Sequence, residues 1–358
     1  MYCYVYNMGD DSWSRQSKFM TAETIQAVCL SLASLTANQR DYYSVVLHGG
    51  EPLLLGADKL SDLLKQLRTV LPTHYPISIQ TNGILITEEI LDICALYQVS
   101  VAVSLDGPAH VHDQFRVTHG GSGTFEQVIA GIAALQSHPE AAFLNAGLLA
   151  VIDPATDPAE IYNFFKTIGA PSVDFLYKDG NHTTLPLGKA AVHSLEYGNW
   201  MIGLLNSYMN DVDPLPIRVL DDMLKVLLGG NVSKEGLGVT DFGILIIDTN
   251  GAFMKNDTLK SSFSGADKFS QPVNVSETNL IDFLHSVEFD QYRQMQKPTS
   301  KKCLACAELN VCGGGMILHR WHDQSGFNNA SVYCSDQLYL IGHMRQLLST
   351  YSIDHAYC

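Results

Sequence analysis

The sequence is short of basic residues. Its 22 Lys and Arg stand against 37 Asp and Glu, which gives a formal net charge of −15 at pH 7. Because such an excess repels phosphates and anionic headgroups, we expect neither duplex nucleic acid nor an anionic membrane as a partner. We also find no signal peptide, no transmembrane run and no polybasic tail. Without a secretory signal, the cysteines are expected to stay reduced in the cytoplasm.

Internal repeats and low-complexity segments are missing as well, apart from an alternation of strand and helix patterns. The 358 residues are 46% hydrophobic and 16% charged, an ordinary balance for a globular protein with a real core. This length predicts two or three domains.

Half of the eight cysteines fall in one short segment. They form the pattern C-x2-C-x5-C, with a fourth 22 residues further on, at Cys303, Cys306, Cys312 and Cys334. Four thiolates gathered in this way hold a metal, either a [4Fe–4S] cluster or a structural zinc. Three glycines after Cys312 would let the backbone pass close to the metal. These residues alone leave iron, zinc and a chance clustering of core cysteines open.

The first half of the chain alternates strand and helix patterns at a spacing of roughly 25–40 residues, which predicts a parallel sheet with helical crossovers. Helices are expected at 21–35 and 57–71, after Thr87 as an N-cap, after a capping box that begins at Thr124, and from Asp157. The expected strands are 43–47, 76–80, 99–103, 143–151 and 172–177.

Polar, glycine-rich segments follow the first three of these strands. They are His48-Gly49-Gly50-Glu51-Pro52, Thr81-Asn82-Gly83 and Ser104-Leu105-Asp106-Gly107. Each is weak evidence alone, since strand-to-helix turns use glycine anyway. In barrel folds the chemistry lies at the carboxyl ends of the strands. Three such segments in succession therefore predict one shared ligand pocket.

The second half is expected to begin with a helical bridge over 188–229 that stops at Gly229-Gly230. Residues 244–254 predict a β-hairpin with a type I′ turn at Asn250-Gly251. Further helices are expected at 279–296 and 336–349.

The combined pattern resembles radical S-adenosylmethionine (SAM) enzymes with a SPASM auxiliary-cluster domain. More narrowly, it is similar to the maturases that cross-link aromatic residues in ribosomally made peptides (RiPPs). The resemblance implies a partial (β/α)6 barrel over 1–183, a helical bridge over 184–235 and a SPASM domain over 236–358. It is carried by Cys3-Tyr4-Val5-Tyr6-Asn7, His48–Pro52, Ser104–Pro108, Asp257-Thr258-Leu259-Lys260, Cys312–Gly315 with His319-Arg320, and Ser331–Cys334.

The sequence departs from that family at its start. The family carries C-x3-C-x2-C after its first strand, three thiolates for the SAM-cleaving [4Fe–4S] cluster. Cys3 matches the third cysteine, so the other two and the first strand would precede Met1. Either the chain is part of a longer enzyme or it is a natural degenerate form. Because one thiolate does not hold this cluster, we expect that the chain alone does not cleave SAM.

The resemblance implies roles for residues around SAM. Gly49, Gly50 and Glu51 would bind its amino group, and Ser104 and Arg116 its carboxylate and ribose end. The ordinary alternatives are a tight turn at the glycines and a surface ion pair at Arg116.

Two more residues belong to the same expected pocket. Tyr4 would line the adenine, or simply pack in the core, and Asp106 would order its loop, or cap a helix.

The auxiliary-cluster pattern is only partly kept. Asn256 stands where the family has the cysteine of G-x4-C, and Met316 stands where it has the second cysteine of C-x3-C. The resemblance therefore implies one auxiliary [4Fe–4S] cluster, fully ligated by Cys303, Cys306, Cys312 and Cys334, as an electron conduit or structural clamp. His319 and Arg320 would contact substrate or the cluster surroundings, or else be solvated polar residues.

Asp257 follows the lost ligand and is the candidate catalytic base, although an aspartate beside a hairpin more often makes turn hydrogen bonds. The implied activity is that of a radical SAM oxidoreductase that cross-links an aromatic side chain of a precursor peptide to a nearby Cβ. A reducing protein such as a ferredoxin or flavodoxin would supply its electrons. The alternatives are a non-catalytic iron–sulfur protein that binds a precursor peptide or partner maturase, and a zinc-stapled binding protein.

Overall fold

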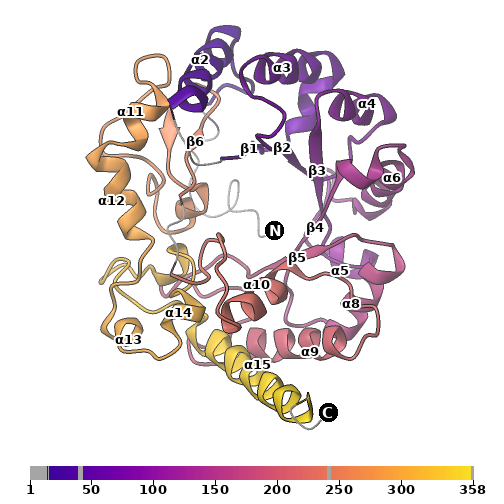
Figure 1. Ribbon diagram of the computed structural model, residues 1–358, viewed down its shortest axis with the longest axis vertical. Helices are drawn as coiled ribbons and strands as arrows, with labels where there is room; N and C mark the ends of the chain where they lie inside the picture. The colour runs from indigo at the N-terminus through magenta and orange to yellow at the C-terminus, as the bar shows by residue number, and fades with distance from the viewer. Residues whose placement is uncertain (1–13, 15, 39–42, 240–242, 356–358) are drawn as a thin grey trace.

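A five-stranded parallel sheet organises the N-terminal half (Figure 1). The computed structural model describes residues 14, 16–38, 43–239 and 243–355. The strands follow one another in the order β1-β2-β3-β4-β5, so each new strand adds to the same edge. This confirms the predicted α/β class. The strands are β1 (Val45–Leu47), β2 (Ile77–Thr81), β3 (Val99–Ser104), β4 (Asn145–Val151) and β5 (Val173–Leu176).

The two faces of the sheet differ in chemistry. In β2 and β3 every second residue is buried, while the residues between them are only partly buried. Successive side chains of a strand point to opposite faces, so the apolar set packs under the helices and the polar set faces the interior of the curved sheet. Gln80 and Ser104 lie on that inner face, where Gln80 Nε2 donates to Ser104 Oγ at 3.0 Å.

Helices cover the outer face of the sheet (Figure 1). Thr87 and Asp157 cap their helices as predicted, since each side-chain oxygen accepts a backbone N–H of the first turn. The predicted capping box at Thr124 is wrong, because Asp113 Oδ1 accepts the first N–H groups instead, at 2.8 and 2.9 Å. The helices are α2 (Ala22–Asn38), η2 (Pro52–Leu55), α3 (Gly56–Val70), α4 (Glu88–Leu96), α5 (Ala109–His112), α6 (Phe125–Ser137), α7 (Ala141–Leu144) and α8 (Pro158–Thr167).

The bridge is two helices rather than one, α9 (Glu196–Met209) and α10 (Arg218–Leu227). Pro214 and Pro216 stand between them and cannot continue a helix. Instead the segment pairs with the sheet, where the Val173 N–H donates to Pro216 O at 2.9 Å. The predicted stop is confirmed, because the N–H groups of Gly229 and Gly230 close a Schellman motif on the carbonyls of Val226 and Lys225.

The hairpin is confirmed as antiparallel strands β6 (Ile246–Ile247) and β7 (Phe253–Met254). Its turn is not type I′, because Gly251 has φ +84° while Asn250 has negative φ. The Gly251 N–H donates to Asp248 O and the Asp248 N–H to Ala252 O, as in a three-residue loop that ends in a left-handed glycine.

The remaining helices are short except the last. The expected helix at 279–296 is broken at Ser286, whose hydroxyl accepts the Phe289 N–H and so starts a new helix. These elements are η3 (Asp257–Ser261), α11 (Leu280–Leu284), α12 (Val287–Met295), α13 (Lys301–Leu304), α14 (Leu309–Cys312), η4 (Leu318–Arg320) and α15 (Cys334–His355).

The C-terminal half returns to the start of the sheet domain, so the elements form a ring (Figure 1). α11 packs on α2, where Ser31 Oγ donates to Asn279 Oδ1 and accepts the Leu280 N–H at 2.6 Å. At the other end α15 packs on α9. The part of the chain that the structure describes contains no helix with the length and apolar character to span a bilayer.

Candidate functional site

Glu51 connects the carboxyl ends of β1 and β2. Its Oε1 accepts the Thr81 hydroxyl at 2.7 Å and the Leu53 N–H at 3.1 Å, and its Oε2 accepts the Asn82 N–H at 2.8 Å. The carboxylate is thus oriented by donors from two strand ends and still has lone pairs for a further donor. Gly49, just before it, is exposed and has φ +55°, which favours glycine.

Asp106 and Arg116 form a bidentate pair at the end of β3. Arg116 Nε lies 2.7 Å from Asp106 Oδ2 and Nη2 lies 3.1 Å from Oδ1. Asp106 Oδ1 also accepts the Val151 N–H at 3.0 Å, which ties the ends of β3 and β4 together. The Asp106 side chain is only 3% exposed and that of Arg116 is 23% exposed. Arg116 therefore presents an oriented guanidinium that Asp106 already neutralises.

His112 supports this loop as a neutral, fully buried ring. Its Nδ1 accepts the Asp106 N–H at 3.4 Å and its Nε2 lies 3.1 Å from Thr124 Oγ, which in turn donates to Arg116 O. Burial lowers the pKa of His112 to about 4, against the opposing effect of the Asp106 charge.

The end of β5 carries two residues that the sequence prediction missed. Lys178 is 3% exposed, and its Nζ lies 3.2 Å from Asp153 Oδ1 and 4.5 Å from the centre of the Phe115 ring. Asp179 follows it, and burial together with the charges of Asp257 and Glu235 raises its pKa to about 7. The signal was available, because Lys178-Asp179-Gly180 follows a predicted strand just as the three polar, glycine-rich segments do.

Asp257 lies at the start of η3, close to these groups. Asn256 caps η3 through the Thr258 N–H, and its Nδ2 donates to Glu235 Oε2 at 2.5 Å. Burial, against the Arg320 charge, raises the pKa of Glu235 to about 7, with a further contribution from Asp257.

The loop after β5 is held to η3 directly, because Asn181 Nδ2 donates to Ser261 O at 3.1 Å. Three carboxylates from separate segments, Asp179, Glu235 and Asp257, thus share one neighbourhood. No local sequence pattern identifies Glu235, since its partners lie far along the chain.

The four clustered cysteines share a second neighbourhood. Cys303, Cys306 and Cys334 all interact electrostatically with Cys312, whose pKa is raised to about 12 by burial. Cys312 Sγ donates to Gln337 Oε1 at 3.1 Å. Within the described ranges, no group of three or more His, Cys, Asp or Glu is already arranged as a closed metal shell. The cysteines are therefore gathered as free thiols rather than as preformed ligands.

The first of the glycines after Cys312 makes a close backbone contact. Gly313 has φ +65°, and a Cβ there would lie 2.2 Å from Gly238 O. The close approach is thus to the backbone of the 234–238 loop.

Arg320 is a buried cation beside the cysteines. It is 1% exposed and its Nε has no hydrogen-bond partner. Burial lowers its pKa to about 10, while the negative charges of Cys303, Glu235 and Cys312 oppose that shift. His319 is buried too, with a pKa lowered to about 3 by burial, so the prediction of solvated polar residues at 319–320 is wrong. A buried guanidinium whose Nε lacks a hydrogen-bond partner is better stabilised by nearby thiolates than by neutral thiols. Arg320 therefore fits a metal bound by the four cysteines as thiolates.

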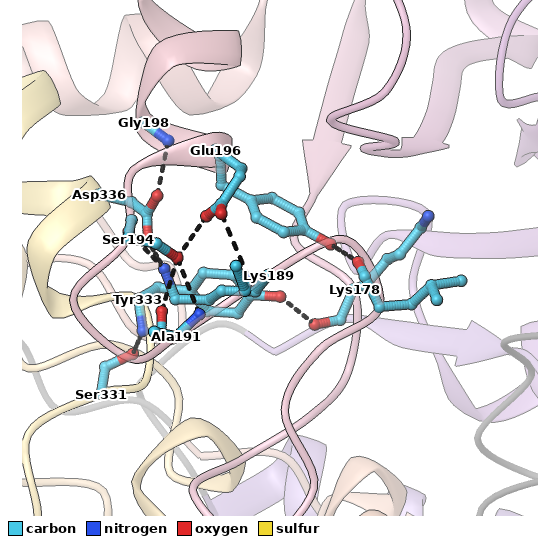
Figure 2. Close-up of polar contacts among 12 residues, drawn as sticks. Lys178, Lys189, Ala191, Ser194, Glu196, Gly198, Ser331, Tyr333 and Asp336 are labelled. Carbon is cyan, nitrogen blue, oxygen red and sulfur yellow. Dashed lines mark hydrogen bonds and ion pairs between the residues drawn. The ribbon is translucent and has the colours of Figure 1, made fainter.

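A buried anchor holds the fourth cysteine against the sheet domain (Figure 2). Lys189 Nζ lies 2.6 Å from Asp336 Oδ2, and Asp336 Oδ1 accepts the Gly198 N–H at 2.8 Å. Tyr333 OH donates to Lys178 O at 2.5 Å. The Lys178 side chain points away from this anchor (Figure 2). The segment that carries Cys334 is therefore fixed to the end of β5.

Ser104 accepts Gln80 on the inner face of the sheet. Cys29 and Cys94 are buried core residues, as predicted. Cys3 and Tyr4 lie outside the described residues.

Comparison with known proteins identifies similar folds. Residues 1–145 match the family model described as the radical SAM superfamily. A cysteine-type anaerobic sulfatase-maturating enzyme of Clostridium novyi is 23% identical over 350 residues, which cover 93% of this chain and 88% of that protein.

Two solved structures extend the comparison. Native anSMEcpe with bound AdoMet has a TM-score of 0.81 at 18% identity, with 98% of this chain and 94% of that one covered. Streptococcus suis SuiB bound to precursor peptide SuiA has a TM-score of 0.60 at 15% identity, with 93% and 72% covered. The chain thus has the α/β fold of these radical SAM structures.

Proposed function

We propose that this chain is of the radical SAM oxidoreductase type that modifies a ribosomally made precursor peptide by cross-linking an aromatic side chain to a nearby Cβ, and that the chain alone does not hold the SAM-cleaving cluster. The observation that carries the proposal is the polar rim at the carboxyl ends of the parallel strands. Glu51, the Asp106–Arg116 pair and Lys178 with Asp179 all lie on that rim. The family match over 1–145 and the similar folds support the radical SAM class.

Residues at the carboxyl ends of the strands are assigned to different parts of SAM. When bound, SAM and a reduced [4Fe–4S] cluster supply the abstraction of a hydrogen atom from the substrate. Gly49, Gly50 and Glu51 orient the SAM amino group, while Ser104 and Arg116 orient its carboxylate and ribose end.

After one hydrogen atom has been abstracted, bond formation to the aromatic ring requires the loss of a second hydrogen from the substrate, as one proton and one electron. Asp257 accepts the proton, and two further carboxyl groups, Asp179 and Glu235, lie in its neighbourhood. Cys303, Cys306, Cys312 and Cys334 would hold an auxiliary [4Fe–4S] cluster, which would supply an electron conduit or a structural clamp.

The remaining parts of the proposal follow from the same resemblance. The precursor peptide is the substrate, a ferredoxin or flavodoxin supplies electrons, and the protein works in the cytoplasm. The domain division is 1–183, 184–235 and 236–358. Two relatives support a peptide substrate, one named a sulfatase-maturating enzyme and one solved with a precursor peptide.

The test is an anaerobic assay of the reconstituted, dithionite-reduced chain with SAM and synthetic peptides that contain aromatic residues. Formation of 5′-deoxyadenosine shows SAM cleavage and overturns the expectation that the chain alone is inactive. A peptide that has lost two hydrogens and resists fragmentation between two residues supports the cross-link. An aldehyde trapped by a hydrazine probe would instead indicate oxidation of a single side chain and would contradict the cross-link.

The same preparation separates the alternatives. A brown protein that contains iron and sulfide but forms no 5′-deoxyadenosine, even with a supplied partner maturase, favours a non-catalytic iron–sulfur protein. A colourless protein that contains zinc rejects the iron–sulfur assignment.

A further inference from the structure

Arg320 is among the largest fully buried side chains of the described residues. Its Nη2 donates to Gln296 O at 2.7 Å and to Met295 O at 3.4 Å, while Nε has no partner. Within the described ranges it forms no ion pair with Asp or Glu. A buried charge that is not compensated costs several kcal/mol, so its counter-charge has to come from the groups around it.

The negatively charged groups that interact with Arg320 are Cys303, Glu235 and Cys312. Negative charge on Cys303 and Cys312 interacts favourably with the guanidinium, and so does Glu235. Glu235 is itself held by the Asn256 amide and shares its neighbourhood with Asp257. Neutral thiols offer no counter-charge, whereas four metal-bound thiolates carry a net negative centre with either iron–sulfur or zinc.

We propose that Arg320 is the positioning residue that provides the buried positive charge for the metal centre of Cys303, Cys306, Cys312 and Cys334. The two backbone carbonyls at 295–296 orient its guanidinium through Nη2, and Nε remains a buried donor without a hydrogen-bond partner. This inference rests on the proposed metal centre but holds for iron–sulfur and for zinc. It predicts that Arg320 sets both how firmly the metal is held and how easily an iron–sulfur centre is reduced.

Lys302 provides a matched control. It is a second cation beside the same centre and interacts with Cys334, but its side chain is exposed. Solvent screens an exposed charge, so its removal is expected to matter much less. The two substitutions remove the same formal charge and differ mainly in burial.

The experiment measures metal retention in the anaerobically loaded full chain with R320Q, R320K and K302Q. We expect R320Q to lose metal to a chelator about 10- to 100-fold faster than the unchanged protein, the range found for residues behind metal ligands. R320K keeps the charge and is expected to stay within a few-fold, and so is K302Q.

A second measurement separates charge from general destabilisation. If the centre contains iron and sulfide, its midpoint potential is followed by EPR during a redox titration. Reduction adds negative charge, so R320Q is expected to shift the potential downwards while R320K and K302Q leave it nearly unchanged. A merely structural Arg320 would not produce this pattern.

The outcomes are distinct from those of the proposed function. If the chain binds no metal at all, the proposed metal centre is wrong, and so is the proposed role of Arg320. If metal is bound but R320Q retains it as firmly as the unchanged protein, with the same potential, only the Arg320 inference is overturned. If R320Q does not fold, R320K decides, because a folded R320K that loses its metal shows that the charge is not what matters.

Discussion

Lys189 and Asp336 form an ion pair in which both side chains are fully buried, with Nζ and Oδ2 2.6 Å apart. Lys189 also donates to Ser194 O, and Asp336 accepts the Gly198 N–H, so neither charge depends on the other alone. A Cβ on Gly198 would lie 3.0 Å from the Asp336 backbone, which explains the glycine at this contact. The pair joins the loop before α9 to the first turn of α15, two residues beyond Cys334.

Breaking this pair should destabilise the protein strongly. D336N or K189M leaves one buried charge without its counter-charge, which costs about 3–5 kcal/mol. Urea unfolding of the metal-free protein measures the loss. The control is E308Q, which removes a half-exposed pair with Arg345 and is expected to cost at most about 1 kcal/mol. Equal costs for D336N and E308Q would contradict a structural role for the buried pair.

Asp106 should be needed for both stability and SAM binding. D106N keeps the size of the side chain but loses the charge that holds Arg116 in its bidentate geometry. A hydrogen bond to a charged group is worth about 1.5–3 kcal/mol, so we expect a loss of that order and a weaker affinity for SAM by equilibrium dialysis. D92N removes an exposed carboxylate and serves as the control. Unchanged SAM affinity in a folded D106N would reject the proposed role of this loop.

The protein should lose stability as the pH falls, because His112 is buried as a neutral ring. The pKa of His112 is about 4 in the folded protein and 6.5 for an ordinary histidine, so between these values the unfolded chain binds a proton that the folded protein does not. The free energy of unfolding therefore decreases as the pH falls from about 6.5 to about 4, by at most about 3 kcal/mol. Urea melts across this window measure the slope.

H112N should remove most of this slope, because asparagine binds no proton in the window. H110N replaces an imidazole that is 63% exposed and controls for the loss of a histidine at the surface. An unchanged slope in H112N would show that other groups cause the acid sensitivity.

Local patterns were enough to predict the sheet. Each observed strand starts and ends within two residues of its prediction, because apolar alternation and the polar residues after it are both local signals. Two helix predictions were too long although the stops were visible. Pro214 and Pro216 separate α9 from α10, and Ser286 caps α12.

The site was only partly predictable, because much of it depends on contacts between distant segments. Lys189 and Asp336 are 147 residues apart, and neither lies in a motif. The burial of Glu235 and Arg320 next to groups of other segments likewise could not be predicted from the local sequence. The Thr124 capping box failed for a similar reason, since Asp113 from the preceding loop competes for the same N–H groups.

Glycine at position 313 should be indispensable, in contrast to glycines of similar backbone geometry elsewhere. Both Gly313 and Gly229 have positive φ, +65° and +87°, so alanine at either costs about 1–2 kcal/mol of backbone strain. Only Gly313 is also crowded, because its Cβ would lie 2.2 Å from Gly238 O, whereas nothing lies within 4 Å at Gly229. G313A must therefore push apart the 234–238 loop and the Cys312 segment.

The two substitutions separate strain from crowding. G229A is expected to lower the urea midpoint modestly and to leave metal content unchanged. G313A is expected to lose several-fold more stability and to displace Cys312, so that the anaerobically loaded protein holds less metal. Because Glu235 lies in the displaced loop, the pairing of Glu235 with Asn256 should be disturbed as well. A G313A protein with the metal content and stability of G229A would mean that the contact between these two loops does not hold the cysteine centre in place.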